Sequence, residues 1–130
     1  MILEIAKKAV GNIVVLEMTG RITLGRDCQQ IEADVDELVR GKQARIVFDL
    51  SKVKYMDSSG VGIMVMCSGK VKEAGGELRI AGAAGVVAQT LLLTRMNAIV
   101  PTFATLAEAL AGFQEATLAS ARIRACAGTE

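Results

Sequence analysis

Short apolar runs, separated by polar or glycine-containing turns, follow one another along the chain. Two β-leaning runs, LEIAKKA and NIVVLEMTG, flank Gly11-Asn12, a dipeptide typical of tight turns, so residues 3–19 are predicted to form a hairpin. The segment QQIEADVDELVRG then carries apolar residues at the spacing of one helix face, namely Ile31, Val35, Leu38 and Val39. An amphipathic helix that ends at Gly41 is expected there.

The rest of the chain alternates between strand and helix patterns. The predicted elements are a strand at 44–50, a helix at about 58–74, a strand at 77–82, a helix at 85–97, a strand at 98–103 and a helix at 105–113. The spacing of Thr105 and Glu108 fits a capping box at the start of the last helix. The order ββαβαβαβα predicts a single α/β domain, a mixed four- to five-stranded sheet with about four helices packed on it.

Composition narrows the classes of partner. The 130 residues are 52% hydrophobic, enough for one compact domain with a core. Lys and Arg number 15 against 14 Asp and Glu, so there is no basic excess for binding phosphate backbones. Stacking platforms for bases are also scarce, since the aromatic residues are Phe48, Tyr55, Phe103 and Phe113. Nucleic acid is therefore not expected as a partner.

Cysteine and histidine usage limits the kinds of disulfide, metal site and catalytic site that the chain can form. Cys28, Cys67 and Cys126 are odd in number and far apart, which favours neither a disulfide framework nor a zinc site. The chain has no histidine, which excludes histidine-based nucleophilic catalysis and histidine-ligated zinc. No secretory signal pattern and no apolar run of membrane-spanning length occur, so a cytoplasmic protein without a membrane partner is expected.

The stretch YMDSSGVGIMV carries the candidate chemistry. Asp57, Ser58 and Ser59 lie between a predicted buried strand and a predicted helix, where Asp or Ser is a preferred helix cap, and the sequence does not say which residue is the cap. A nucleophile elbow would need glycine where Asp57 stands, and a lysine-based serine mechanism would have to use Lys52 or Lys54. No phosphate-loop pattern is present, so no nucleotide or other cofactor is expected.

A phosphorylation switch is the third interpretation of this stretch. A phosphoserine in the first helical turn would face free N–H groups and the positive end of the helix dipole. Gly60 would allow a partner to approach the preceding hydroxyl, because glycine has no Cβ. The helix that follows is apolar nearly all round, which fits a core helix. Exposed methionines there, Met64 among them, would form an adaptable contact surface.

The residues IVFDLSKVKYMDSSGVGIMV resemble the signature of the STAS domain family, the sulphate transporter and anti-sigma factor antagonist fold, in its small stand-alone bacterial form. The resemblance also covers the initial hairpin, MTGRIT, GGELRIAG and FATLAEAL, and implies a domain over residues 3–113. Residues 114–130 are expected to form a helical extension or a flexible tail.

The resemblance implies an anti-sigma factor antagonist that is not an enzyme. In that family the second serine of the motif, here Ser59, is phosphorylated by an anti-sigma factor with serine kinase activity, and a PP2C-type phosphatase removes the phosphate. By similarity, the partner-binding residues are Asp57, Ser58 and Gly60 of the phosphoacceptor turn and Gly20, Arg21 and Thr23 of the loop near it. Met64 is added to them as a methionine of the apolar helix. Sporulation antagonists carry acidic residues where this chain has Arg21 and Thr23. A monomer or weak homodimer is expected.

Two other functions remain open. A STAS adaptor subunit of a lipid-transport or stress-signalling complex would use the same fold without a phospho-switch. An enzyme would require a turnover that depends on Ser59, and a comparison of the wild-type chain with Ser59→Ala tests that possibility. An intact hydroxyl at position 59 favours the switch, since an adaptor would tolerate its loss.

Overall fold

The computed structural model describes residues 3–111 and residue 113 of the chain. The tail predicted at 114–130 lies outside these residues. The hairpin is confirmed: β1 (Glu4–Val10) pairs antiparallel with β2 (Ile13–Ile22) around a turn in which Gly11 has φ 62°. That left-handed conformation suits glycine, which explains the turn signal in the sequence.

The remaining elements follow in the predicted order. They are α1 (Arg26–Arg40), β3 (Arg45–Met56), α2 (Ser58–Glu73), β4 (Glu77–Ala81), α3 (Gly85–Leu93), the 3₁₀ turn η1 (Met96–Ala98), β5 (Thr102–Phe103) and a last helical segment at residues 106–111. The five strands of the described chain form one mixed sheet in the order β1-β2-β3-β4-β5. β2 through β5 pair in parallel, as helical crossovers require.

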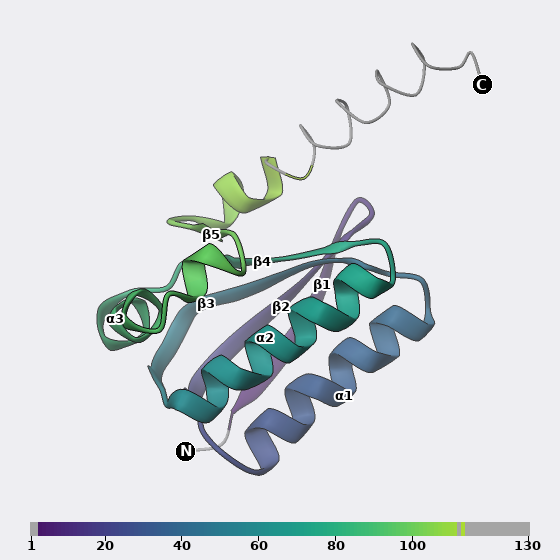
Figure 1. Cartoon of the computed structure of the whole chain (residues 1–130). Coiled ribbons are helices and arrows are strands. Elements are labelled where there is room, and N and C mark those ends of the chain that lie inside the picture. Colours follow the sequence, from purple (N-terminus) through teal and green to yellow (C-terminus); the bar gives the residue numbers. More distant parts are fainter. Residues whose placement is uncertain (1–2, 112, 114–130) are drawn as a thin grey trace, which may run out of the picture.

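Helices cover both faces of the sheet to different extents (Figure 1). α1 and α2 lie side by side across one face, and their apolar sides join the main core, which includes Ile31, Val35, Phe48, Met64 and Leu78. The last helical segment packs on the opposite face through a smaller cluster with Ile13, Val15, Val47, Ala81, Ala109 and Phe113. The sheet is thus a rigid support whose strand ends position the loops.

Three predicted boundaries were wrong by more than three residues. β3 extends to Met56 rather than ending at residue 50, because the polar run after Leu50 still pairs with β2 across two irregularities in register. α3 ends at Leu93, since Arg95 takes a left-handed conformation with φ 57°. β5 is confined to Thr102–Phe103 because Pro101 has no N–H to donate.

The helices of the described residues include none that is both long enough and apolar enough to cross a lipid bilayer.

Candidate functional site

Asp57 joins three segments at the carboxyl end of the sheet. It is the N-cap of α2, and its Oδ1 accepts a hydrogen bond from the Gly60 amide at 3.0 Å. Its Oδ2 accepts one from the Leu24 amide at 3.3 Å, in the loop between β2 and α1. The Asp57 amide in turn donates to the Ile22 carbonyl at 3.2 Å. The choice of cap that the sequence left open is therefore settled in favour of Asp57.

The two serines are the first two residues of α2, and they differ in exposure. Ser58 is exposed, whereas Ser59 is half-buried. The Asp57 carboxylate occupies the Gly60 amide, and the Val61 amide donates to the Asp57 carbonyl at 3.2 Å. Within the described residues no hydrogen-bond acceptor is recorded for the amides of Ser58 and Ser59. A negative group on either serine would meet these donors and the positive end of the helix dipole.

Gly60 serves the packing of α2 against β2 and β3. A Cβ at this position would lie 2.6 Å from Met56 Cγ and 2.9 Å from Ile22 Cγ2, both inside the core. The interpretation of Gly60 as an open approach for a partner is therefore wrong, because the glycine is buried and its missing side chain admits residues of its own chain. Exposed Gly62, two residues further, has no heavy atom within 4 Å of an added Cβ.

The loop that precedes α1 lies against the turn at residues 57–60. Gly20 is buried with φ 117°, a conformation that favours glycine. The Thr23 amide and hydroxyl both donate to Asp27 Oδ2, at 3.1 and 3.0 Å. These two bonds attach the loop to the start of α1. The bond from the Leu24 amide to Asp57 attaches it to the start of α2. Ile22 and Leu24, on either side of Thr23, thus contact Asp57 directly, whereas Gly20 lies opposite Val53 in β3.

Cys28 packs behind this loop. Its thiol donates to the Thr23 carbonyl at 3.3 Å and approaches the Ser59 carbonyl at 3.7 Å. Burial, with the Asp57 and Asp27 carboxylates, raises the pKa of the Cys28 thiol, so the group stays protonated and able to donate. Sequence analysis had not connected this cysteine with the site, because a contact between residues of two different elements leaves no local pattern.

Arg21 is exposed beside the site and rests on an aromatic ring. Its guanidinium carbon lies 4.9 Å from the centroid of the Tyr55 ring, and the two residues are partners in the parallel register of β2 and β3. A cation over an aromatic face is attracted by the ring quadrupole. The contact therefore favours one direction of a side chain that is solvent-exposed.

Met64 is not available to a partner. Its exposed fraction is 0%, and it belongs to the core beneath α2, so its prediction as a contact residue is wrong. The exposed apolar residues of the same helix are Val65 and Met66, at 38% and 47%. The sequence alone does not distinguish the buried Met64 from the exposed Val65 and Met66, because a helix that is apolar all round shows no single buried stripe.

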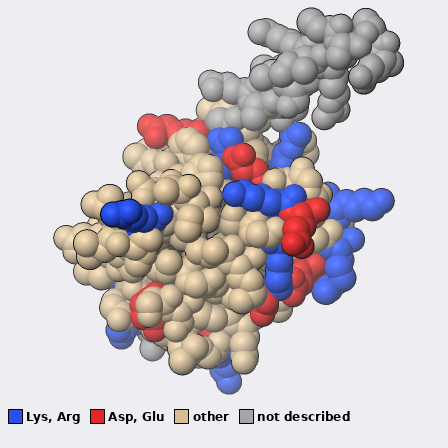
Figure 2. All heavy atoms as spheres, viewed as in Figure 1, with Lys and Arg blue, Asp and Glu red and all other residues tan. Residues whose placement is uncertain are grey.

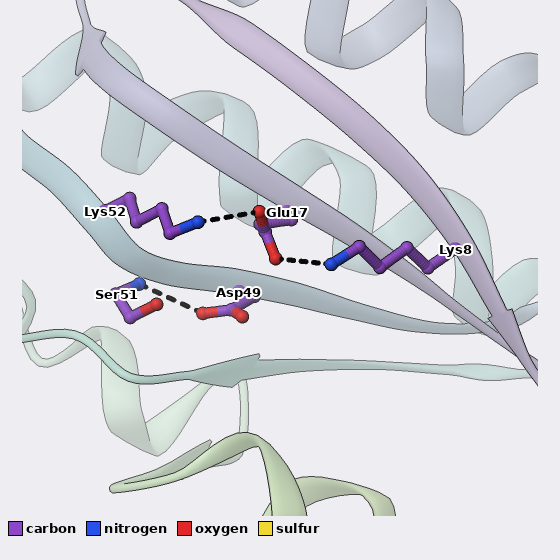
Figure 3. A network of polar contacts seen from close by, with 5 residues as sticks. All are labelled: Lys8, Glu17, Asp49, Ser51 and Lys52. Carbon is purple, nitrogen blue, oxygen red and sulfur yellow. Dashed lines mark hydrogen bonds and ion pairs between the residues drawn. The ribbon is translucent and has the colours of Figure 1, made fainter.

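The lysines near the serines do not form a catalytic pair with them in the observed contacts. Lys52 Nζ lies 3.2 Å from Glu17 Oε1, and Lys8 Nζ lies 2.9 Å from Glu17 Oε2 (Figure 3). The two ammonium groups lower the pKa of the Glu17 carboxyl through these hydrogen bonds. Beside them, the Ser51 amide donates to Asp49 Oδ1 at 3.0 Å. No group of acidic, cysteine or histidine side chains in the described part of the chain is arranged to hold a metal ion.

Comparisons with known proteins agree with this architecture. The family model of the STAS domain matches residues 4–109. A protein described as an anti-sigma factor antagonist from Thermotoga maritima has 24% identity and a TM-score of 0.77, covering 83% of this chain and 92% of its own. An anti-sigma factor antagonist from Mycobacterium paratuberculosis has 20% identity and a TM-score of 0.76, covering 85% and 92%.

A third similar protein has been solved in two states. SpoIIAA, a Bacillus cell fate determinant and anti-sigma factor antagonist, matches in its unphosphorylated and phosphorylated forms with 18% identity and a TM-score of 0.66 in both. Each match covers 85% of this chain, and 98% and 99% of the respective relative. A search of curated protein sequences gave no match. With the family model matching most of its length, the chain belongs to the STAS domain family.

The cap network makes a prediction about Asp57. Asp57→Ala removes the acceptors of both the Gly60 and the Leu24 amides, so it should lower the free energy of unfolding by about 1–2 kcal/mol. Asp57→Asn keeps one acceptor oxygen for Gly60 and should cost about half as much, since Asn is an equally good cap. Urea denaturation of both variants measures the difference. Equal losses would mean that the bond to Gly60 contributes nothing, and an unchanged stability of Asp57→Asn would mean that the bond to Leu24 contributes nothing.

Proposed function

We propose that the protein is an anti-sigma factor antagonist of the cytoplasm, controlled by phosphorylation of Ser59. In the unmodified state it binds an anti-sigma factor with serine kinase activity, and a sigma factor is released. Phosphorylation by that partner ends the complex, and a PP2C-type phosphatase restores the antagonist. The functional unit in this proposal is residues 3–113, acting as a monomer or weak homodimer.

One observation carries the proposal. Ser59 is the second residue of α2, on a turn whose neighbouring carboxylate, Asp57, already accepts hydrogen bonds from two backbone amides. A phosphate of charge about −1.5 to −2 can therefore be added next to free amides without unfolding the domain. Its charge and bulk then fall on whatever protein contacts this turn. The anti-sigma factor antagonists of the same fold support the partner class named here.

The experiment is an affinity pull-down from a lysate of the native host with three baits, the wild-type chain, Ser59→Ala and Ser59→Glu. We expect a small protein related to serine kinases to be retained by the first two baits and lost from the third. Ser58→Glu is the matched control, because it places the same charge one residue away, on the exposed hydroxyl position.

Two results would contradict the proposal. Identical partners on the three Ser59 baits would favour a STAS adaptor in which the hydroxyl has no switching role. Equal loss from Ser58→Glu and Ser59→Glu would mean that negative charge anywhere on the turn disturbs binding, so that Ser59 would have no particular part in recognition.

A further inference from the structure

Helix α3 is apolar on sides that the described part of the fold does not cover. None of its nine residues is charged, and the buried ones are Val87 and Leu91. Leu92 and Leu93 are 66% and 83% exposed, and Ile99 after the helix is 45% exposed. Figure 2, viewed as in Figure 1, shows few charged side chains over α3 and many toward the C-terminal ends of α1 and α2. An apolar surface of this kind marks a place where another segment or protein binds.

An open cavity of about 310 Å³ lies between α3 and β5. Its lining includes Ala88, Leu91 and Leu92 of α3 and Phe103 and Ala104 at the end of β5, and its polar side chains are uncharged. Walls of this kind favour aliphatic side chains, because a charged group without a partner would lose its hydration there. The cavity therefore suits a leucine-like side chain better than a charged ligand.

The last described residue lies near this cavity. The guanidinium carbon of Arg79 is 5.1 Å from the ring centroid of Phe103, which lines the cavity, and 4.3 Å from that of Phe113. Arg79 is 8% exposed, and its Nη1 donates to the Ala109 carbonyl at 3.4 Å. These contacts hold the last helical segment against the sheet. Residues 114–130 therefore start close to the uncovered surface of α3.

The sequence of residues 114–130 contains an uncharged stretch within reach of the cavity. Residues 116–121 read ATLASA, and Leu118 and Ile123 are the large aliphatic residues of the segment. An extended chain spans at most about 3.5 Å per residue, so Leu118 can lie up to about 17 Å from Phe113. A segment tethered this closely has an effective concentration on the order of 1 mM. It therefore competes favourably with apolar segments that other proteins supply.

We propose that residues 116–123 dock on α3 of their own chain, with Leu118 in the cavity between α3 and β5 and Ile123 against the exposed side of the helix. The apolar cavity, the uncharged helix and the short connection from Phe113 together select this occupant. Docking removes apolar surface from water and keeps α3 from pairing with a second copy of the chain. The inference is independent of the proposed role of Ser59.

Nuclear magnetic resonance of the full-length chain tests this contact directly. In the wild-type chain we expect nuclear Overhauser effects between the Leu118 methyl groups and the methyl group of Ala88, which lines the cavity. Leu118→Ser should shift the amide resonances of residues 83–92 and 102–104. Leu118→Met should leave them close to their wild-type positions, because methionine keeps an apolar side chain of similar volume.

Two comparisons test the specificity and the occupancy of the cavity. Leu24→Ser is the matched control, because it removes a leucine that is 77% exposed in the loop before α1, and it should leave the resonances of α3 unchanged. A synthetic peptide of residues 114–130 should bind the Leu118→Ser chain about tenfold more tightly than the wild-type chain. In the wild-type chain the tethered segment already fills the cavity.

Each other result overturns the inference. In an equimolar mixture of ¹³C-labelled and unlabelled chains, Overhauser effects between the two would identify a second copy as the occupant. Absence of contacts from Leu118 to α3, with unshifted resonances in Leu118→Ser, would leave the surface for a different protein. Shifts spread over the whole sheet would indicate that Leu118 supports the fold. Equal binding of the peptide to both chains would mean that the cavity is free in the wild-type chain.

Discussion

Phosphorylation of Ser59 should lower the affinity for the kinase-like partner by about 100-fold or more, while the free energy of unfolding changes by less than about 1 kcal/mol. The first figure corresponds to about 2.7 kcal/mol, within the cost of placing unfavourable charge in a protein interface. The second follows from the position of Ser59 in the first turn of α2, where a negative group interacts favourably with free amides and the helix dipole.

The two quantities are measured on the same phosphorylated chain. Calorimetric titration with the partner gives the affinity, and urea denaturation gives the free energy of unfolding. Ser59→Ala, treated with the same kinase and ATP, is the matched control and should keep full affinity. Unchanged affinity of the phosphorylated chain would remove the switch. Loss of the folded state on phosphorylation would replace an interface mechanism with local unfolding.

Phosphorylation can change the affinity without changing the free energy of unfolding only if the charge of Asp57 does not oppose the phosphate strongly. Asp57 precedes Ser59 by two residues, and its negative charge would repel a phosphate on that serine. Because the amides of Leu24 and Gly60 both donate to it, the site already balances one negative group with backbone donors. The amides of Ser58 and Ser59 remain for the second. Under the proposed switch, the turn would hold two acidic groups at the start of one helix.

Much of the fold could be predicted from local patterns. The face of α1 repeats every three to four residues, and Gly11 marks the hairpin turn, so these elements are visible in a short window. The extension of β3 to Met56 could not be predicted locally, because the polar residues after Leu50 are typical of a loop and form a strand only through their pairing with β2. Tertiary pairing decides such a strand.

The candidate site also has features that a local pattern predicts and features that depend on long-range contacts. The position of Ser59 at a helix start follows from a local strand-to-helix pattern, and the structure places it there. The bond between Leu24 and Asp57 joins residues 33 positions apart, and the Arg21–Tyr55 contact depends on strand register. The prediction of Met64 as a contact residue was wrong because packing against the sheet sets the rotation of α2, and the sequence does not show that rotation. Long-range contacts of this kind are absent from any local window.

Gly60→Ala should lower the free energy of unfolding by about 2 kcal/mol, and Gly62→Ala should raise it by about 0.5–1 kcal/mol. Alanine is the better helix former at both positions, so helix propensity alone predicts stabilisation twice. At position 60 the added methyl group would overlap Met56 Cγ and Ile22 Cγ2, whereas at position 62 it meets open space. The opposite signs therefore isolate the contact between α2 and the strands.

Urea denaturation of the two variants, with the slope of the transition unchanged, measures this difference. Stabilisation by both substitutions would show that Met56 and Ile22 can move aside, and that the close packing of the first turn is not required. Destabilisation by Gly60→Ala together with stabilisation by Gly62→Ala would show that the turn that carries Ser59 is held against the core by the absence of a side chain at position 60. In that case Gly60→Ala should also weaken partner binding, because α2 must shift, and Ser59 with it.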